Sequence, residues 1–549
     1  MIKKLSLLFH TLRYLKPIQL YWRLYLKVSR LFQFSTEIKE AIKVKPIVLT
    51  PPIAKYESLV EGQFHFLNEV GCVILPMNWN NDKQSKLWLY NLHYFDYLNQ
   101  QQIDQQLALD LMQDWISQNP VGTGNGWEPY TLSLRIVNWI KLLSKTSVQD
   151  EQLLPLYNSL FLQSRYLFKH LEYHLLGNHL FKNGVALLFA GTFFKGDEAR
   201  SWLNKGKQII LEQTEEQVLA DGGHFERSPM YHLLILEDIL DCLSLDQSAD
   251  NFSVSEKDFM QNKGSAMLNF VADILHQDGE IPFFNDTALH IAPAPESIFN
   301  YANNLGVKFS TNVDETGVIE KPDFGLFVLQ NQHSKLIFDV GVIGPDYLPG
   351  HAHCDSLSYE FSLAGKRCIV NSGTYQYAGE KRNSFRATNA HNTLCIDGVE
   401  QHEIWSTFRV ARRAPPFNVS VHNKKTDSIE CSAAISSCKK GLRETIHKRV
   451  LNFQQNQFVI VDEIEGDGLH FAESFIHLHP EVKIIKSTDS ELQCQLGEAD
   501  FSIKAMDELK FDVEKAWFSA EFGLKVENTV VVIRKQAISP FSLSYKVCF

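Results

Sequence analysis

The spacing of apolar residues changes once along the chain, near residue 320. Between about residues 60 and 310, apolar residues recur every three or four positions, in stretches separated by Gly, Asn and Pro. This period is typical of amphipathic helices, and few strand-like runs interrupt it. The clearest predicted helices are Gln105–Gln118, Thr131–Lys145, Gln152–His174, Ala199–Ala220 and Met230–Leu243.

Beyond about residue 320 the chain consists of short runs rich in Val, Ile, Phe and Tyr, bounded by Gly, Asn, Asp and Lys. Such runs are typical of antiparallel strands joined by turns. The predicted strands are Gly325–Gln330, Lys335–Val340, Ser356–Ser362, Arg367–Asn371, Thr393–Asp397, Phe417–His422, Ser428–Ser436, Arg449–Phe453, Gln457–Asp462, Phe471–Leu478 and Thr529–Arg534. Their number and spacing predict a sandwich of two packed sheets.

The predicted fold class is therefore α+β with more than one domain, an all-helical domain followed by an antiparallel β-sandwich. The change of period places the boundary between residues 310 and 325. We assign a basic amphipathic segment to residues 1–60, the helical domain to residues 61–315 and the β-sandwich to residues 316–549.

The first 30 residues alternate large apolar and basic side chains and contain seven Lys or Arg and no acidic residue. Such a helix can make peripheral contact with an anionic membrane surface. It can also pack its apolar face on its own domain, and we favour this second interpretation because Pro17 interrupts the pattern.

The same segment begins like a signal peptide, but its apolar run Leu5–Phe9 is short and Arg13 and Lys16 follow it. We therefore expect it to be retained in the mature protein. No apolar run approaches the roughly 18 residues that a membrane-spanning helix needs. A cytoplasmic or membrane-associated location is favoured, with the periplasm as the alternative.

The charge and the cysteine content of the chain exclude some classes of function and structure. The 549 residues carry 53 basic and 64 acidic side chains, and this net charge of −11 argues against a general nucleic-acid binder. The nine cysteines include no Cys-x-x-Cys pair, so a disulfide framework is not expected.

Four polar, Gly-containing clusters lie between the predicted elements, where functional sites concentrate. They are Asn125–Tyr130 with Ser133 and Arg135, Gly177–His179 with Lys182 and Asn183, Asp221–His232, and Gly350–Asp355 with Asn371–Tyr375 and Arg386–Thr393. Some of these residues have structural explanations, since Asn178 could cap a helix and Ser228-Pro229 could begin one. In an extended segment the two imidazoles of His351-Ala-His353 lie on one face, and with His391 they could bind a metal.

These clusters, in this order, resemble the motifs of the heparinase II/III-like polysaccharide lyases, the group that also contains oligoalginate lyases. The resemblance spans about residues 85–415. It implies an incomplete (α/α) toroid joined to an antiparallel β-sandwich, with a cleft for an acidic polysaccharide between them. It also implies β-elimination at C4 of a uronic acid, which requires carboxylate neutralisation, a base at C5 and an acid at O4.

The resemblance also implies roles for individual residues. The expected catalytic residues are Asn178 as the carboxylate-neutralising amide, His179 as its helper, Tyr231 as proton donor or acid and base in one, and His351 as base or neutraliser. The expected substrate-binding residues are Trp127, Glu128, Arg135, Glu226, Tyr375 and Arg386.

Family members with a zinc site imply the ligands His353, Asn371 and His391. The family pattern has Asp where this chain has Asn371, and a neutral amide is a poor zinc ligand. A structural zinc here could be completed by water or by Asp355, or a hydrogen-bonded network could replace it.

Two other functions are compatible with the sequence. A glycoside hydrolase could draw a carboxylate pair from Glu128, Glu226 and Asp286, although a sequence does not give their separation. A non-catalytic carbohydrate-binding or assembly factor in polysaccharide biosynthesis could be held at the membrane by residues 1–30. The lyase hypothesis concerns a bacterial surface polysaccharide or exopolysaccharide containing uronic acid.

Overall fold

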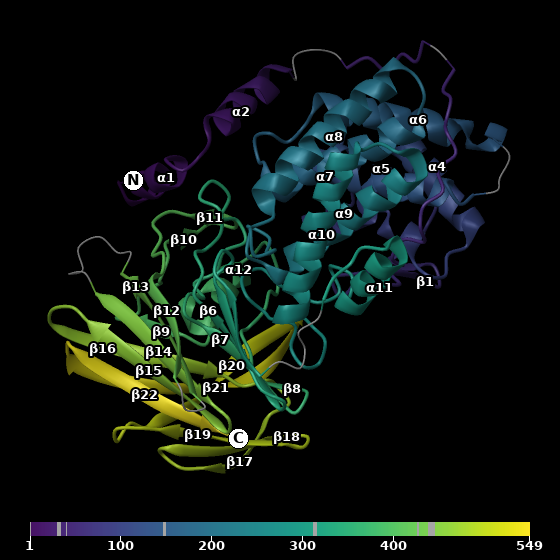
Figure 1. The fold of residues 1–549 in the computed structure, drawn as a ribbon. Coiled ribbons are helices and arrows are strands. Elements are labelled where there is room, and N and C mark those ends of the chain that lie inside the picture. The colour runs from purple at the N-terminus through teal and green to yellow at the C-terminus, as the bar shows by residue number, and fades with distance from the viewer. Residues whose placement is uncertain are drawn as a thin grey trace.

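The computed structural model describes residues 2–29, 34–39, 41–146, 150–310, 316–424, 428–437 and 445–549. It has helices in its N-terminal part and antiparallel sheets in its C-terminal part (Figure 1). Residue 315, at the predicted domain boundary, lies outside the described residues, as do Arg30 and Cys438. The eight cysteines that the structure describes are free thiols, in agreement with the absence of a predicted disulfide framework.

The helices agree with the apolar period. Their bounds are α1 Ile2–Leu12, α2 Pro17–Ser29, α3 Lys86–Tyr94, α4 Gln105–Gln118, α5 Pro129–Leu143, α6 Asp150–Lys169, α7 Gly177–Phe193, α8 Asp197–Gln217, α9 Pro229–Ala249, α10 Val254–Ile274, α11 Pro295–Leu305 and α12 Lys381–Arg386. The five predicted helices are confirmed as α4, α5, α6, α8 and α9. Helix α7 is buried along nearly all of its length, so it lacks the polar stripe by which a pattern reveals a helix.

The N-terminal part also contains strands that the helical pattern did not predict. A small antiparallel sheet precedes α3, formed by β1 Leu59–Val60, β2 Gln63–Phe66 and β3 Glu69–Cys72. Each of these strands has at most four residues, too few for an alternating pattern to emerge. Phe64 and Phe66 of β2 are buried in the helical core, so the sheet closes one side of that core.

The C-terminal part contains three principal antiparallel sheets, where two were predicted. The first has the order β4 Gly317–Lys321, β5 Leu326–Gln330, β6 Ser334–Asp339, β7 Tyr359–Leu363 and β8 Lys366–Ile369. The second has the order β20 Phe511–Glu521, β21 Leu524–Ile538, β16 Leu469–His477 and β9 Leu394–Ile396. The third has the order β12 Phe417–Lys424, β13 Ser428–Ser436, β14 Ile446–Gln454, β15 Gln457–Glu465, β22 Phe541–Cys548, β19 Ala499–Ala505, β18 Glu491–Leu496 and β17 Lys483–Ser487. A two-stranded ribbon, β10 Ile404–Trp405 and β11 Arg409–Val410, lies outside these sheets.

One apolar core fills the space between these sheets, and a second fills the helical part. A smaller cluster joins the two, since Phe270 and Ile274 of α10 pack on Phe324, Leu326 and Ile337 near the first sheet. Buried apolar contacts of this kind fix the two parts in one arrangement. Side chains from both parts can therefore form one site.

The N-terminal helices α1 and α2 lie on the outside of the molecule, α1 beside the β10–β11 ribbon (Figure 1). The favoured interpretation, an apolar face packed on its own domain, is wrong for most of α2. Trp22 stacks on Tyr173 with ring centroids 4.9 Å apart, but Tyr21 and Leu24 are more than half exposed. Within the described residues, no helix combines the length and the apolar composition required to cross a bilayer.

Candidate active site

The N-terminus of α7 holds a carboxylate. Leu176 and Gly177 have φ values of 67° and 55°, and a Cβ on Gly177 would lie 2.9 Å from Oε1 of Glu226. This tight entry brings the Asn178 backbone N–H to 3.1 Å from Glu226 Oε1, and the Asn178 Nδ2 amide to 2.9 and 3.0 Å from its two oxygens. The free N–H groups and the dipole of a helix N-terminus favour an anion there. Asn178 thus already has the geometry of a carboxylate ligand.

His179 follows Asn178 on α7 and pairs with a carboxylate. Its Nδ1 lies 3.0 Å from Oε1 of Glu172, and its ring lies 4.4 Å from the ring of Tyr130. Burial opposes protonation, but the Glu172 carboxylate more than compensates and raises the pKa of His179. This pair therefore makes His179 easier to protonate than a free imidazole.

Tyr231 lies in the first turn of α9. Ser228 caps this helix, its Oγ accepting a hydrogen bond from the Tyr231 backbone N–H at 3.2 Å, and Pro229 occupies the first helical position. The Tyr231 hydroxyl shares a hydrogen bond of 3.0 Å with the hydroxyl of Tyr377. Burial, and then the neighbouring Tyr377, raises the pKa of Tyr231 well above its ordinary value. At neutral pH this hydroxyl is a proton donor.

His351 connects the helical part to the β part. Its ring lies 4.0 Å from the ring of Tyr231, its Nδ1 lies 2.9 Å from Oδ2 of Asp286, and its Nε2 lies 3.4 Å from Oε2 of Glu226. Burial alone would raise the pKa of Asp286, but Arg382 and the hydrogen bonds from His351 and His353 hold it well below its usual range. Because an ionised carboxylate only accepts hydrogen bonds, Nδ1 of His351 is protonated. The other ring nitrogen, Nε2, faces Glu226.

Two known protein-family domains match consecutive stretches of this chain. Residues 86–310 match the family described as "Heparinase II/III N-terminus", and residues 315–545 match the family described as "Heparinase II/III-like, C-terminal". The chain belongs to the heparinase II/III-like family.

Two curated relatives in this family are heparin-sulfate lyases. The chain is 28% identical to the enzyme of Bacteroides stercoris over 319 residues, which cover 54% of this chain and 44% of the relative. It is 24% identical to the enzyme of Pedobacter heparinus over 315 residues, covering 52% and 47%. The aligned part thus spans less than half the length of these relatives. The crystal structure of a heparinase III shares the fold with a TM-score of 0.71 at 18% identity, covering 95% of this chain and 88% of that one.

A second cluster of this heparinase II/III-like chain has the composition of a metal site. His353, Asp355 and His391 are buried, and one ligand atom from each lies within 4.8 Å of the others. His353 Nδ1 and His391 Nε2 have no hydrogen-bond partner among the residues that the structure describes. Burial lowers the pKa of both imidazoles, so both are neutral, as metal ligation requires. The residues present therefore fit a metal ion.

Asn371, the expected third ligand, contacts the His391 ring. Its Oδ1 lies 3.3 Å from Nδ1 of His391 and accepts a hydrogen bond of 3.2 Å from the backbone N–H of Asn392. The amide oxygen therefore orients the His391 ring, whose Nε2 has no partner among the described residues. Asp355 is the carboxylate that lies close to both imidazoles.

Three of the expected substrate-binding residues are buried. Arg135 donates to Gln163 and to the carbonyls of His93 and Gly126, and Trp127 donates to the carbonyl of Asn119. Arg386 is fully buried and donates to the carbonyls of Ala352, Ser406 and Thr407, so it braces the segment between His351 and His353. These bonds to the protein itself contradict the direct substrate contact expected of the three residues.

The other three expected residues have different positions. Glu226 joins Asn178 to His351, as described above. Glu128 is partly exposed and pairs with Lys86 at 2.9 Å and with the Tyr90 hydroxyl. The ring of Tyr375 stacks on Phe385 at 5.7 Å, near the surface.

Sequence reasoning missed Tyr377 and Arg382. Arg382 contacts both oxygens of Asp286 and is 2% exposed, so it neutralises the carboxylate behind His351. Tyr377 lies two positions after Tyr375, and Arg382 four before Arg386, so both lie beside the quoted motifs. No local pattern distinguishes these neighbours, because the contacts that matter cross from one part of the molecule to the other.

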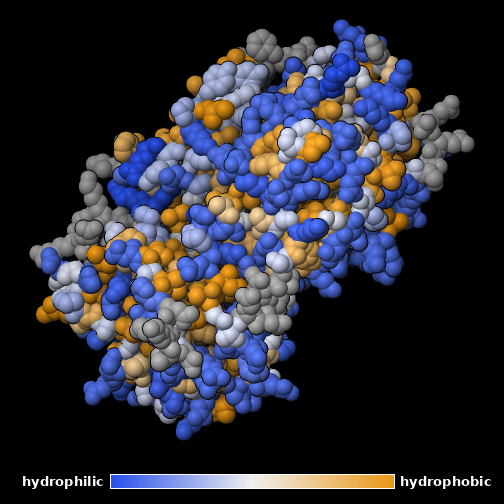
Figure 2. Space-filling model, in the orientation of Figure 1, coloured by the Kyte–Doolittle hydropathy of each residue, from blue (hydrophilic) through white to orange (hydrophobic). Residues whose placement is uncertain are grey.

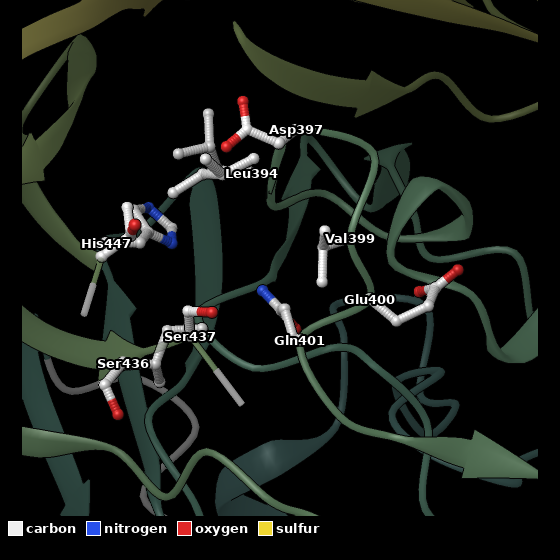
Figure 3. A pocket seen from close by; sticks show the side chains of 11 residues that line it. Leu394, Asp397, Val399, Glu400, Gln401, Ser436, Ser437 and His447 are labelled. Carbon is white, nitrogen blue, oxygen red and sulfur yellow. The ribbon is translucent and has the colours of Figure 1, made fainter. Parts of the chain in front are cut away.

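A small pocket elsewhere in the β part shares no residue with this constellation (Figure 3). It is lined by residues from the turn after β9 and from β13 and β14, among them Asp397, Gln401 and His447. The His447 imidazole already pairs with Asp462 at 2.8 Å. None of the proposed catalytic residues lines this pocket, so it is separate from the candidate active site.

Proposed function

We propose that the protein is a polysaccharide lyase that cleaves a polymer containing uronic acid by β-elimination. The observation that supports this most directly is the convergence of Asn178, Tyr231 and His351, with Tyr231 and His351 in ring contact at 4.0 Å. The names of the relatives, heparin-sulfate lyases, favour a glycosaminoglycan-like substrate. The helical part is proposed to form an incomplete (α/α) toroid over residues 61–315, with the β-sandwich over residues 316–549.

The first requirement of the reaction is a neutralised substrate carboxylate. The proton at C5 is weakly acidic while the adjacent carboxylate is negative, so donors must offset this charge as it develops. Asn178 and His179 are consecutive residues at the start of α7; the Asn178 amide holds Glu226, and His179 pairs with Glu172. We assign the binding of the substrate carboxylate to these two residues.

The second requirement is a base and an acid. We assign His351 as the base, with Nε2 accepting the C5 proton; the electrons of the C–H bond form the C4–C5 double bond and the C4–O4 bond breaks. The Tyr231 hydroxyl gives its proton to the leaving O4, and the Tyr377 hydroxyl at 3.0 Å orients it and stabilises the resulting phenolate. Asp286 keeps Nδ1 of His351 protonated throughout.

The arrangement disfavours a glycoside hydrolase. A hydrolase needs one carboxyl group that is protonated when it meets the leaving oxygen. The pKa of Asp286 is held well below its usual range, chiefly by Arg382 against the effect of burial. Glu128 is tied to Lys86 and Tyr90. The third candidate, Glu226, is held by the Asn178 backbone N–H and side-chain amide, which donate to it. None of the three carboxyl groups is therefore free to meet a leaving oxygen as a general acid.

The products distinguish these two reactions. Purified protein is incubated with a panel of uronate polymers, including heparan sulfate, chondroitin sulfate and alginate, and followed by ultraviolet absorbance and mass spectrometry. Elimination gives a new unsaturated uronate that absorbs in the ultraviolet, with no water added to the products. Saturated products that have gained water would contradict the proposal.

We also propose that His353, Asp355 and His391 bind a structural zinc ion. The ion would hold these side chains in place, and His353 would in turn support Asp286, to which its Nε2 lies at 2.9 Å. Burial raises the pKa of Asp355, and a bound cation would offset this by favouring the carboxylate.

The zinc proposal predicts that the purified protein holds one equivalent of zinc. A chelator should remove this zinc and lower the melting temperature of the protein. Asp355→Asn is expected to lower the metal content about tenfold or more, because it removes the anionic ligand. The matched control is His276→Gln, which breaks another buried imidazole–carboxylate pair, with Glu360 at 2.9 Å. It should lose stability and keep the metal. Equal metal content in wild type and Asp355→Asn would contradict the assignment.

A further inference from the structure

The outer face of α2 is apolar. Nine of the 29 large apolar side chains that are exposed among the described residues lie between residues 5 and 28. Six of them are on α2: Ile18, Leu20, Tyr21, Leu24, Tyr25 and Val28. At 100° per residue they occupy one arc of about 160°. In Figure 2, orange hydrophobic residues and paler residues of intermediate hydropathy are mixed at the surface where Figure 1 places α2.

Helix α1 also exposes apolar residues. Leu5, Phe9 and Leu12 are 59%, 64% and 47% exposed. Their spacing of four and three residues places them on one side of the helix. We call the two helices together the arm, residues 2–29; each of them has an exposed apolar face.

The arm is fixed in this orientation by contacts on its inner side. The Thr11 hydroxyl accepts a hydrogen bond of 3.0 Å from Nε1 of Trp405, and the Ser6 hydroxyl accepts one of 2.9 Å from Arg412. The ring of Trp22 stacks on Tyr173 at 4.9 Å. These inner contacts are polar and aromatic.

Basic residues border the apolar arc. On the helical wheel of α2, Lys27 and then Arg23 follow directly after Leu20, and both are exposed. Lys4 and Arg13 are exposed at the two ends of α1. Residues 1–30 contain no Asp or Glu, while the whole chain has a net charge of −11. The arm is thus a positive and apolar surface on an acidic protein.

We infer that this arm binds the surface of an anionic phospholipid bilayer. An amphipathic helix with Tyr and Leu on one face and Lys and Arg at its border lies in the plane of the headgroups, with its apolar side inserted. Each basic residue near such a surface adds attraction to acidic lipids. The inference does not depend on the proposed enzymatic activity.

Vesicle sedimentation tests the inference with the full-length chain. Wild type is expected to sediment with vesicles of equal parts phosphatidylglycerol and phosphatidylcholine, and to bind pure phosphatidylcholine vesicles at least about tenfold more weakly. Leu20→Ser/Leu24→Ser and Arg23→Gln/Lys27→Gln should each reduce binding to the acidic vesicles about tenfold or more. Val254→Ser is the matched control, because Val254 is 79% exposed at the start of α10.

The outcomes separate the alternatives. Circular dichroism and thermal unfolding should be the same for all three variants and wild type, because the altered side chains face solvent. No sedimentation of wild type with acidic vesicles would overturn the inference, as would equal binding to both kinds of vesicle. A wild-type dimer in analytical ultracentrifugation that Leu20→Ser/Leu24→Ser dissociates would assign the face to a second copy and would also overturn it.

Discussion

A Tyr231→Phe variant is expected to lose about 1,000-fold in kcat on any uronate polymer that the wild type cleaves. The substitution removes only the hydroxyl that shares a hydrogen bond with Tyr377 and that we propose protonates the leaving O4. A ring remains in contact with His351, so KM should change little. The measurement is the initial rate of ultraviolet absorbance from the unsaturated product.

Tyr359→Phe is the matched control for this loss. Tyr359 and Tyr545 form another buried pair, with their hydroxyls 3.0 Å apart inside the β-sandwich and away from the site. Removing that hydroxyl has the same local cost in hydrogen bonding and should leave kcat within about threefold of wild type. If Tyr231→Phe were no slower than Tyr359→Phe, Tyr231 would not be the proton donor.

The apolar period revealed most of the long helices, but α7 and α10 were not among its clearest predictions. The strand predicted at Ser428–Ser436 is β13, and its alternating residues are buried and half-buried. Helix α7 is buried on nearly all sides, and the Gly177–His179 motif marks its start. Burial alone does not explain the omission, because α9 is buried as fully and was predicted. Periodicity reports the contrast between solvent and core, so a fully buried helix is indicated by the length of its apolar run and by its capping residues instead.

The sequence motifs identified the proposed catalytic residues better than they identified the residues that position them. Asn178, Tyr231 and His351 lie in one site, although they are far apart in the sequence. Arg386 was expected to face the substrate, but it is enclosed among carbonyls, and Arg382 is the guanidinium that reaches the site. Both arginines lie on α12, and which of them meets Asp286 depends on how the helical part packs against the sheets.

An Asp286→Asn variant is expected to lose both stability and activity. Asp286 is fully buried and pairs with Arg382, which is 2% exposed, so the neutral amide leaves a buried guanidinium unpaired. Breaking such a pair costs about 3–5 kcal/mol in the free energy of unfolding. The amide also ceases to fix the protonated Nδ1 of His351, and we expect kcat to fall about 100-fold or more. Urea unfolding and the elimination assay measure these two effects.

The pH dependence of this stability follows from the lowered pKa of Asp286. The folded-state pKa lies well below the ordinary value, because Arg382 and two histidines outweigh burial. The stabilisation is therefore complete above the unfolded-state pKa and is lost as the pH falls through the folded-state value. The difference in unfolding free energy between wild type and Asp286→Asn should be full at neutral pH and shrink only in strong acid.

Asp462→Asn separates the catalytic effect from the structural one. Asp462 is also fully buried, in the β-sandwich. It accepts hydrogen bonds from Arg449, and one of its oxygens lies 2.8 Å from Nε2 of His447. Its substitution should destabilise the protein by a similar amount and leave kcat unchanged at temperatures where the variant is folded. If the two variants lost kcat equally, the lower activity of Asp286→Asn would result from its lower stability, and the proposed positioning role of Asp286 would be wrong. A loss confined to Asp286→Asn would establish that this carboxylate orients His351 for proton transfer.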